Sequence, residues 1–201
     1  MNITLLTLSS LEYWDILKLS APNKLEYCLR HKYQLITRLH NYTKEPKNWG
    51  EREMIMLDSL SSCDWLFFQG ADTLITNMNI PLTSLIDINY DFIITKDING
   101  INNDNMLIKN CQASREFLQK VLYQRSTPND QDAMKLLLNS ESNFKVKYAG
   151  QKEFNSYIYG EYKASYPQGE WGPNDFVIHF PGMVNSRRIP LMTEYLGRVV
   201  R

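Results

Sequence analysis

Hydrophobic residues occur along the chain in short runs, and segments with apolar residues at helical spacing separate these runs. Continuous apolar runs bounded by turn residues are typical of buried strands, and amphipathic spacing is typical of helices. The pattern predicts strands at 3–8, 33–37, 65–68, 92–95, 105–109, 144–148 and 176–180. It predicts helices at 11–19, 24–31, 49–61, 114–124, 126–138 and 191–200, a short helical turn at 81–86, and loops at 40–48 and 154–171. This alternation predicts an α/β fold whose central, mixed and mostly parallel sheet is flanked by helices.

The size and composition of the chain narrow the classes of protein. Its 201 residues, of which 43% are hydrophobic, suffice for one domain with a substantial core. Lysine plus arginine and aspartate plus glutamate are equal at 22 each, so the chain lacks the basic excess typical of nucleic-acid-binding proteins. Its apolar runs are too short to span a membrane, and three cysteines without close pairs favour a reducing compartment. We therefore expect a cytoplasmic protein with no nucleic-acid partner.

Asp72 and His179 are the first candidates for chemistry, because each lies at the end of a predicted buried strand. Asp72 follows the apolar run 65–68, and His179 lies in the run 176–180 just before a Pro-Gly pair. Open α/β sheets bind ligands at the carboxyl ends of their strands. A carboxylate and an imidazole there could hold a metal for a phosphate-bearing substrate. Two alternatives stay open: Asp72 as a strand-end turn residue, and His179 as a hydrogen-bonded histidine of the core.

Three further polar segments could contact a ligand. Asp130 and Gln131 open a predicted helix, where they could bind sugar hydroxyls or complement the helix dipole. Segment 97–105 is rich in Asp and Asn, a composition typical of a solvated hairpin loop but also suited to a loop that binds a ligand. Arg187 and Arg188 could hold a diphosphate or form a surface pair. The chain contains no GxGxxG motif and no Walker A loop, which argues against a Rossmann dehydrogenase.

Five segments, in order along the chain, carry motifs of one family. Residues 23–33 are similar to the motif Asn-Lys-x-x-Tyr-x-x-x-His-Gly-Tyr, and Trp49 with 64–68 is similar to a Trp-x-Lys helix and the strand before Asp-x-Asp. Residues 102–114 are similar to Leu-Asn-x-Gly-x-Phe-Leu-Ile-Arg-Asn. Asp130-Gln131 matches an Asp-Gln pair, and 179–182 matches His-Phe-x-Gly. Together they resemble the metal-dependent, retaining nucleotide-sugar glycosyltransferases of family 34. Single matches of this kind are weak, but an ordered set is fairly specific. The resemblance implies a single GT-A (Rossmann-like) domain over residues 1–201.

The resemblance also implies a role for each candidate residue. Mn²⁺, or alternatively Mg²⁺, would be bound by Asp72 and His179, and the diphosphate of a UDP-sugar would complete its coordination. The catalytic residues would be Asp130 and Gln131. Nucleotide contacts would come from Thr7, Leu8, Ser9, Tyr13, Ala71, Asp72 and Arg187, and sugar or acceptor contacts from Asp97, Asn102, Asp130, Gln131 and Gly182. The domain would divide into a nucleotide-binding half at 1–77 and a sugar and acceptor half at 78–201.

By this resemblance the protein is expected to transfer a sugar from a UDP-sugar to a glycan hydroxyl with retention, in glycoprotein glycan synthesis. The chain also resembles domains of large glycosyltransferases of chlorella viruses, which would place a viral protein in the host cytoplasm. It departs from the motifs where Gly70 replaces the first Asp of Asp-x-Asp, Asp104 replaces the Gly of Asn-x-Gly, and Glu51, followed by Arg52, replaces the Lys of Trp-x-Lys. We expect water to act in place of the carboxylate that Gly70 lacks. A second hypothesis stays open: a degenerate domain that binds a nucleotide or glycan without transfer.

Overall fold

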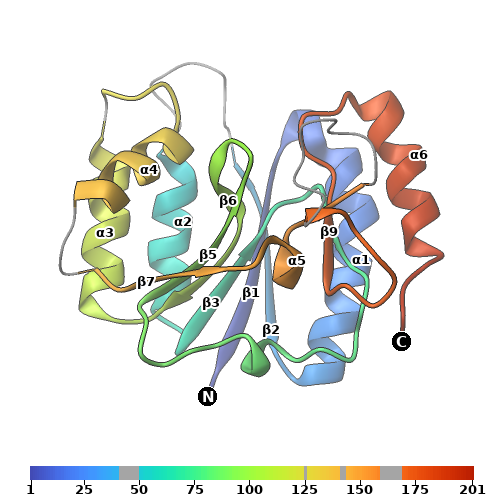
Figure 1. Cartoon of the computed structure of the whole chain (residues 1–201), viewed down its shortest axis with the longest axis horizontal. Coiled ribbons are helices and arrows are strands. Elements are labelled where there is room, and N and C mark those ends of the chain that lie inside the picture. The colour runs from blue at the N-terminus through green and yellow to red at the C-terminus, as the bar shows by residue number, and fades with distance from the viewer. Residues whose placement is uncertain (41–49, 125, 141–143, 159–168) are drawn as a thin grey trace.

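The centre of the molecule is a six-stranded sheet, in a computed structural model that describes residues 1–40, 50–124, 126–140, 144–158 and 169–201 (Figure 1). The strand order is β2-β1-β3-β6-β5-β7. The strands are β1 (Ile3–Ser10), β2 (Gln34–His40), β3 (Trp65–Gln69), β5 (Phe92–Asp97), β6 (Gly100–Lys109) and β7 (Val146–Ala149). β1 is parallel to β2 and β3, β5 is parallel to β7, and β6 is antiparallel to both neighbours. The predicted mixed, mostly parallel sheet is confirmed; the predicted loop 40–48 and Trp49 lie almost wholly outside the described residues.

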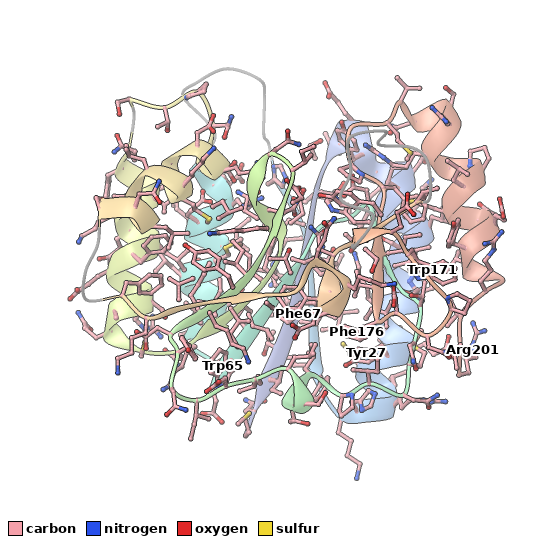
Figure 2. The ribbon with its side chains drawn as sticks, viewed as in Figure 1. Tyr27, Trp65, Phe67, Trp171, Phe176 and Arg201 are labelled. Atoms are coloured by element: carbon pink, nitrogen blue, oxygen red, sulfur yellow. The ribbon has the colours of Figure 1, made fainter. Side chains whose placement is uncertain are left out.

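Helices cover both faces of this sheet, as the alternation of elements predicts (Figure 1). Every residue of β1 and β3 is buried, so both of their faces need a covering layer. One face packs against α2 (Glu51–Leu60), α3 (Gln112–Tyr123) and α4 (Asp130–Ser140), and the other packs against α1 (Trp14–His31), which α6 (Asn185–Leu196) flanks. Figure 2 shows Tyr27, Phe67 and Phe176 gathered on this second face. The ring of Phe176 lies 5.4 Å from that of Tyr27 and 6.2 Å from that of Phe67.

A second sheet of three short strands lies beside the first, and the sequence pattern predicts only one of its strands. Its order is β4-β9-β8. The strands are β4 (Thr73–Ile75), β9 (Val177–His179) and β8 (Ser156–Tyr157), and the short helix α5 (Gln151–Phe154) precedes β8. The predicted loop at 154–171 is therefore wrong at its start, and residues 159–168 lie outside the described part of the chain. Strands of two or three residues are too short to show an alternating pattern.

Pro22 does not end a helix, contrary to the sequence prediction of separate helices at 11–19 and 24–31. A 3-10 turn (Leu11–Tyr13) leads instead into the single helix α1, and Pro22 lies inside it. A proline inside a helix costs about 3 kcal/mol. Packing outweighs this cost, because Leu17 before the proline and Tyr27 after it are both buried. Each such burial stabilises the fold by about 2 kcal/mol.

The carboxyl-terminal helix also begins earlier than predicted. α6 starts at Asn185, and not at residue 191, so that Pro190 lies within its first turns. The remaining regular element is a 3-10 turn (Leu82–Ser84) within the predicted segment 81–86. Among the described residues, the helices are all too short or too polar to cross a membrane.

Candidate functional site

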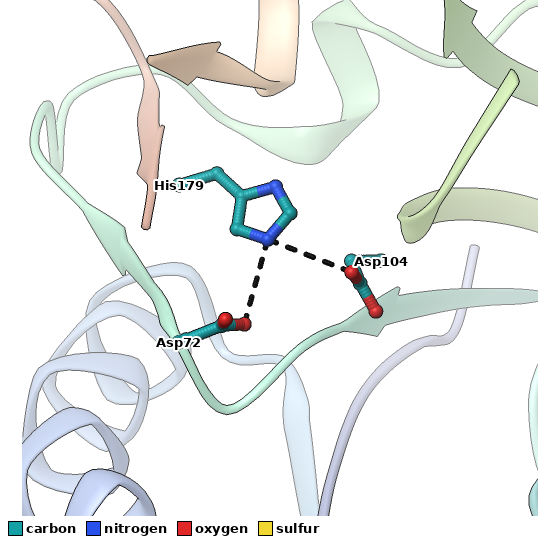
Figure 3. A group of neighbouring side chains, drawn as sticks. All are labelled: Asp72, Asp104 and His179. Carbon is teal, nitrogen blue, oxygen red and sulfur yellow. Dashed lines mark ion pairs between the residues drawn. The ribbon is translucent and has the colours of Figure 1, made fainter. Parts of the chain in front are cut away.

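Backbone pairing brings Asp72, Asp104 and His179 together from three distant parts of the chain (Figure 3). Asp72 lies between β3 and β4, and β4 pairs antiparallel with β9, which ends at His179. The N–H of Phe180 donates to the carbonyl of Asp72 at 3.0 Å. Asp104 belongs to β6, and its carbonyl accepts a hydrogen bond from the N–H of Gly70 at 2.7 Å, just beyond the end of β3. The junction of the two sheets therefore creates the cluster.

The three side chains point toward one centre (Figure 3). Nε2 of His179 lies 3.5 Å from Oδ1 of Asp72 and 3.5 Å from Oδ2 of Asp104, and the three ligand atoms lie within 4.8 Å of one another. His179 is fully buried, yet its Nε2 makes no hydrogen bond to any described residue. Buried polar atoms normally have a partner, and two carboxylates with an imidazole suit Mn²⁺ or a similar cation. The residues therefore fit a metal, and Asp104 offers a carboxylate where Gly70 lacks one, a residue that the sequence reasoning did not name for this role.

Two largely buried arginines, Arg52 and Arg188, each pair with the carboxylate oxygen of Asp104 or Asp72 that does not face His179. Nη2 of Arg188 lies 3.4 Å from Oδ2 of Asp72, and Nε of Arg188 donates to the carbonyl of Phe180 at 3.0 Å. Nη1 of Arg52 lies 3.6 Å from Oδ1 of Asp104. Each carboxylate thus directs one oxygen to the centre and the other to an arginine. The two guanidinium groups orient the carboxylates and offset their mutual repulsion.

The electrostatic field at this centre favours a cation. Burial disfavours the charged form of Asp72, but His179 and Arg188 outweigh burial and lower the pKa of Asp72. Burial first, and the charge of Asp72 as well, raise the pKa of Asp104 despite the opposing effect of His179. Burial also disfavours charge on His179, yet the two carboxylates raise the pKa of this imidazole. The same carboxylates that attract a proton to His179 would attract a divalent cation.

A cavity of about 280 Å³ opens over the carboxylates, and six of its lining residues were predicted to contact the nucleotide or the sugar. The six are Leu8, Ser9, Tyr13, Ala71, Asp72 and Gly182. The other lining residues are Ser10, His40, Arg52, Phe68, Gly70, Asp104, Pro181 and Arg188. Arg188 thus lines the cavity, whereas its predicted neighbour Arg187 is exposed, and the nucleotide contact of Arg187 stays a prediction.

Sequence reasoning did not assign Asp104 or Arg52 to the site, and it named Arg188 only together with Arg187 as a candidate for holding a diphosphate. The sequence did contain a signal for Asp104. This chain lacks the first acid of Asp-x-Asp at Gly70, and it has an acid at residue 104, where the family motif has Gly. Arg52 lies one place from the lysine of the family motif. No sequence signal distinguishes Arg188 from Arg187, because consecutive residues of a helix point about 100° apart and only the packing of α6 selects one.

Thr7, a predicted nucleotide contact, is not among the residues that line the cavity and accepts a hydrogen bond from a buried lysine. Nζ of Lys24 donates to Oγ1 of Thr7 at 3.0 Å and to the carbonyl of Gly70 at 2.6 Å. Burial lowers the pKa of Lys24 from 10.5 to about 7, although Asp72 and Asp104 partly oppose this effect. Lys24 therefore ties α1 to the ends of β1 and β3, and the nucleotide contact of Thr7 stays a prediction.

Lys24→Met is expected to change how stability depends on pH. The pKa of Lys24 is about 7 in the folded chain and 10.5 in the unfolded chain, so the unfolded chain binds more protons between these two pH values. The wild type therefore gains stability relative to the variant as the pH rises through this window, and loses it as the pH falls. The difference in unfolding free energy should change by about 2 kcal/mol between about pH 7 and about pH 9. Urea unfolding of both proteins measures it, and a difference that is constant with pH would contradict the assignment.

The predicted catalytic residues lie beside the cavity and are held by hydrogen bonds. Asp130 begins α4, and its Oδ2 lies 2.9 Å from Nε of Arg52, whose Nη1 faces Asp104. Oε1 of Gln131 accepts a hydrogen bond from the N–H of Asn103 at 3.4 Å. Arg52 thus connects Asp130 to the carboxylate cluster. The roles of Asp130 and Gln131 in the reaction stay predictions.

Asp97 and Asn102, the predicted sugar and acceptor contacts, are buried. Nδ2 of Asn102 donates to Oδ2 of Asp97 at 3.1 Å, and its Oδ1 accepts from the N–H of Asp104 at 3.1 Å. Asp97 also lines a second cavity, of about 650 Å³, between the β5–β6 turn and α5. Their contact with a substrate stays a prediction.

The chain matches one protein family and several solved structures. The model of the galactosyl transferase GMA12/MNN10 family matches residues 2–88 and 85–189. A comparison with curated protein sequences gave no significant match. A glycosyltransferase involved in the glycosylation of the major capsid of PBCV-1 has a TM-score of 0.74 at 18% identity, over 96% of this chain and 100% of that chain. The galactosyltransferase LgtC, in complex with donor and acceptor sugar analogues, has a TM-score of 0.62 at 14% identity, over 98% and 96% of the two chains.

A third structure, the apo form of the glycosyltransferase GlyE of Streptococcus pneumoniae TIGR4, has a TM-score of 0.59 at 14% identity, over 97% of this chain and 60% of that chain. At these identities the structures establish the fold, which is of the GT-A type. The family match covers the chain from Asn2 to Ile189, and so includes every residue that lines the first cavity. The chain therefore belongs to the galactosyl transferase GMA12/MNN10 family, the family 34 that its motifs resemble, and is a glycosyltransferase.

Proposed function

We propose that the protein is a Mn²⁺-dependent, retaining glycosyltransferase that transfers a sugar from a UDP-sugar to a hydroxyl of a glycan acceptor. The observation that carries the proposal is the cluster of Asp72, Asp104 and His179, whose two carboxylate residues line a cavity together with predicted nucleotide contacts. The acceptor would be a glycan of a glycoprotein. The involvement of the PBCV-1 enzyme in the glycosylation of a capsid protein supports this part of the proposal.

In this proposal, residues in and beside the cavity would each receive one part of a UDP-sugar. Ser9 and Tyr13, at and just after the end of β1, would receive the uridine, and the half-exposed ring of Tyr13 could stack on the base. The guanidinium of Arg188 lies 5.2 Å from the centre of that ring and 3.4 Å from Asp72. A positive charge between the base and the carboxylate cluster suits a diphosphate. Asp130 would lie on the side of the sugar, beyond Arg52.

The reaction would proceed on one face of the donor sugar. The bond between the anomeric carbon and the diphosphate breaks, the acceptor oxygen bonds to that carbon from the same side, and the acceptor proton passes to the departing phosphate. A divalent cation bound by the cluster would neutralise the negative charge that develops on the diphosphate. The sugar would acquire oxocarbenium character in the transition state.

Asp130 would stabilise the oxocarbenium-like sugar electrostatically. Its carboxylate is paired with Arg52 at 2.9 Å, and a carboxylate held in this way is a weaker nucleophile. This pairing supports the same-face route over a double displacement through Asp130. A glycosyl adduct trapped on Asp130 would contradict the same-face route.

The second hypothesis, a degenerate domain that binds without transfer, depends on the loss of the first Asp of Asp-x-Asp. Asp104 offers a carboxylate within 3.5 Å of His179, so the cluster retains two acids beside its imidazole. This observation favours an active enzyme.

Calorimetry with UDP, in the presence of Mn²⁺ and in the presence of a chelator, tests the proposal. We expect UDP to bind at least about tenfold more tightly with Mn²⁺, because metal and diphosphate share the site and their affinities are coupled. GDP should bind more weakly under the same conditions. Turnover across a panel of UDP-sugars, with the anomeric configuration of the product read by NMR, then tests transfer and retention. UDP binding that is absent, or indifferent to the metal, would overturn the proposal.

A further inference from the structure

A chain of buried hydrogen bonds connects His179 with Asp97, whose carboxylate lies at the wall of the second cavity. The hydroxyl of Tyr157 donates to Oδ2 of Asp97. Nδ2 of Asn155 donates to the hydroxyl oxygen of Tyr157 at 3.4 Å, and Nδ1 of His179 lies 2.8 Å from Oδ1 of Asn155. All four residues are less than a tenth exposed. Bulk water therefore competes little for these hydrogen bonds.

The carboxylate of Asp97, together with the amide of Asn105, determines the direction of the hydrogen bonds in this chain. A carboxylate can only accept, so Tyr157 must use its single hydroxyl hydrogen on Asp97. Burial, together with the charge of Asp97, raises the pKa of Tyr157 and keeps that hydrogen in place. The oxygen of Tyr157 is then an acceptor, so Asn155 must present its amide nitrogen to Tyr157 and its amide oxygen to His179.

Asn105 supports the same orientation of Asn155. Nδ2 of Asn105 donates to Oδ1 of Asn155 at 3.2 Å. Because this oxygen accepts, Nδ1 of His179 must carry a hydrogen, so in the neutral imidazole Nε2 carries the lone pair that faces Asp72 and Asp104. A neutral imidazole binds a metal through the nitrogen that lacks hydrogen, and the partner of its other nitrogen selects that tautomer.

We propose that Asp97 is a positioning residue of the metal site: through Tyr157 and Asn155 it selects the tautomer of His179 that can bind a divalent cation. The inference rests on the proposed metal-dependent function. Asp97 would act on the metal site without touching the metal, because three hydrogen bonds connect its carboxylate to the imidazole that would bind the metal. The role is separate from any contact of Asp97 with substrate.

Asp97→Asn tests the direction of the chain, because it keeps the shape of the side chain. Oδ1 of Asp97 accepts from the N–H of Asn99 at 2.7 Å, so the new amide would turn its oxygen to Asn99 and its nitrogen to Tyr157. Nδ2 of Asn102, which donates to Oδ2 of Asp97 at 3.1 Å and to Tyr157 at 3.0 Å, would lose the first of these acceptors. Tyr157 would then turn its hydrogen toward Asn155, which favours the reversed amide, with its nitrogen toward His179, against the hydrogen bond from Asn105. The hydrogen of the imidazole would move to Nε2, where it opposes a cation.

Tyr157→Phe removes the same hydrogen bond to Asp97 but adds no donor that points the wrong way. Asn105 still holds Oδ1 of Asn155, so the tautomer of His179 should persist in this variant. Asp87→Asn is a matched control, because Oδ1 of Asp87 accepts from the N–H of Asn89 at 3.1 Å in the same kind of turn.

The main measurement is the affinity for Mn²⁺ in the presence of UDP, by electron paramagnetic resonance. We expect Asp97→Asn to weaken this affinity about 10- to 100-fold, the range typical of residues that orient a metal-binding histidine. Tyr157→Phe should stay within about threefold of the wild type, and Asp87→Asn should be unchanged. A second measurement is nitrogen-15 NMR of His179 in the presence of UDP and the diamagnetic ion Mg²⁺. The hydrogen should reside on Nδ1 in the wild type and shift toward Nε2 in Asp97→Asn.

The outcomes separate this inference from the proposed function. Wild-type affinity and a wild-type tautomer in Asp97→Asn would overturn the inference and leave the proposed function intact. Equal losses in Asp97→Asn and Tyr157→Phe, with equally lowered stability, would reveal a merely structural role and would also overturn it. A wild-type protein that binds UDP without any effect of Mn²⁺ would contradict the proposed function, and the inference with it.

Discussion

Asp72→Asn is expected to weaken Mn²⁺-dependent UDP binding by more than about 100-fold. Substitution of a residue that only orients a metal ligand typically costs 10- to 100-fold in metal affinity, so the loss of a ligand itself should cost more. The amide keeps the shape of Asp72 but removes its negative charge from the centre shared with Asp104 and His179. We expect kcat/KM with the best UDP-sugar to fall about 10³-fold. Calorimetry with and without Mn²⁺, and the release of UDP during turnover, measure the two effects.

The fold should survive this substitution. Arg188 would lose one charged partner, but its Nε still donates to the carbonyl of Phe180 at 3.0 Å and its Nη1 to Oδ1 of Asn185 at 3.2 Å. Such a loss costs about 1–3 kcal/mol, so unfolding should begin at lower urea while circular dichroism is unchanged. Asp58→Asn, at an exposed position of α2, is the control for the change in net charge. If Asp72→Asn bound UDP and Mn²⁺ like the wild type, Asp72 would be a strand-end turn residue, the alternative that its sequence context allows.

The central sheet could be predicted because its strands carry their own signal. β1 and β3 are buried along their whole length, and their large apolar residues form short runs that stand out from the polar segments around them. The second sheet carries no such signal. Thr73 pairs with His179, more than a hundred residues away, and the pairing of β4 with β9 is a property of the folded chain that local spacing does not contain.

The candidate site was partly predictable for the same reason. Asp72 follows β3 and His179 ends β9, the hydrophobic pattern predicts both strands, and the family motifs then imply that the two strand ends meet. Asp104 lies inside β6, and its place depends on the register of β6 against β3, where Gln69 pairs with Asn105. A shift of one residue would direct Asp104 to the opposite face of the sheet. The direction of its side chain is therefore known only from the structure.

Gly70 and Asp104 have exchanged the residue types that the family motifs place at these positions. The motifs have Asp at the position of Gly70 and Gly at the position of Asp104. The structure gives this exchange a steric reason: a Cβ atom on Gly70 would lie 3.2 Å from Cβ of Asp104 and 3.2 Å from Oδ1 of Asp72. Side chains at both positions would crowd each other, so a carboxylate at one position makes a carboxylate at the other less favourable. Asp104 therefore occupies the space next to Asp72 that an acid at residue 70 would otherwise need.

Exchanging the two residues back is expected to restore the metal site. Asp104→Gly alone should weaken Mn²⁺-dependent UDP binding about 100-fold, because it removes one of two carboxylates from the cluster. Gly70→Asp alone should also weaken binding, because a third acid crowds Asp72 and Asp104. The double variant Gly70→Asp, Asp104→Gly should recover to within about tenfold of the wild type, a large departure from additivity. Calorimetry with UDP and Mn²⁺ across the four proteins measures the coupling.

The stability of the same four proteins distinguishes metal binding from packing. A glycine inside a strand costs about 1 kcal/mol, so Asp104→Gly and the double variant should both be slightly less stable than the wild type. Recovery of metal-dependent binding without recovery of this stability would identify the carboxylate itself as the restored function. The double variant could instead bind Mn²⁺ and UDP as weakly as the product of the two single effects predicts. An acid at residue 70 would then be unable to replace Asp104 as a metal ligand. The comparison of the double variant with the two single variants therefore tests whether Asp104 is a displaced acid of the Asp-x-Asp motif.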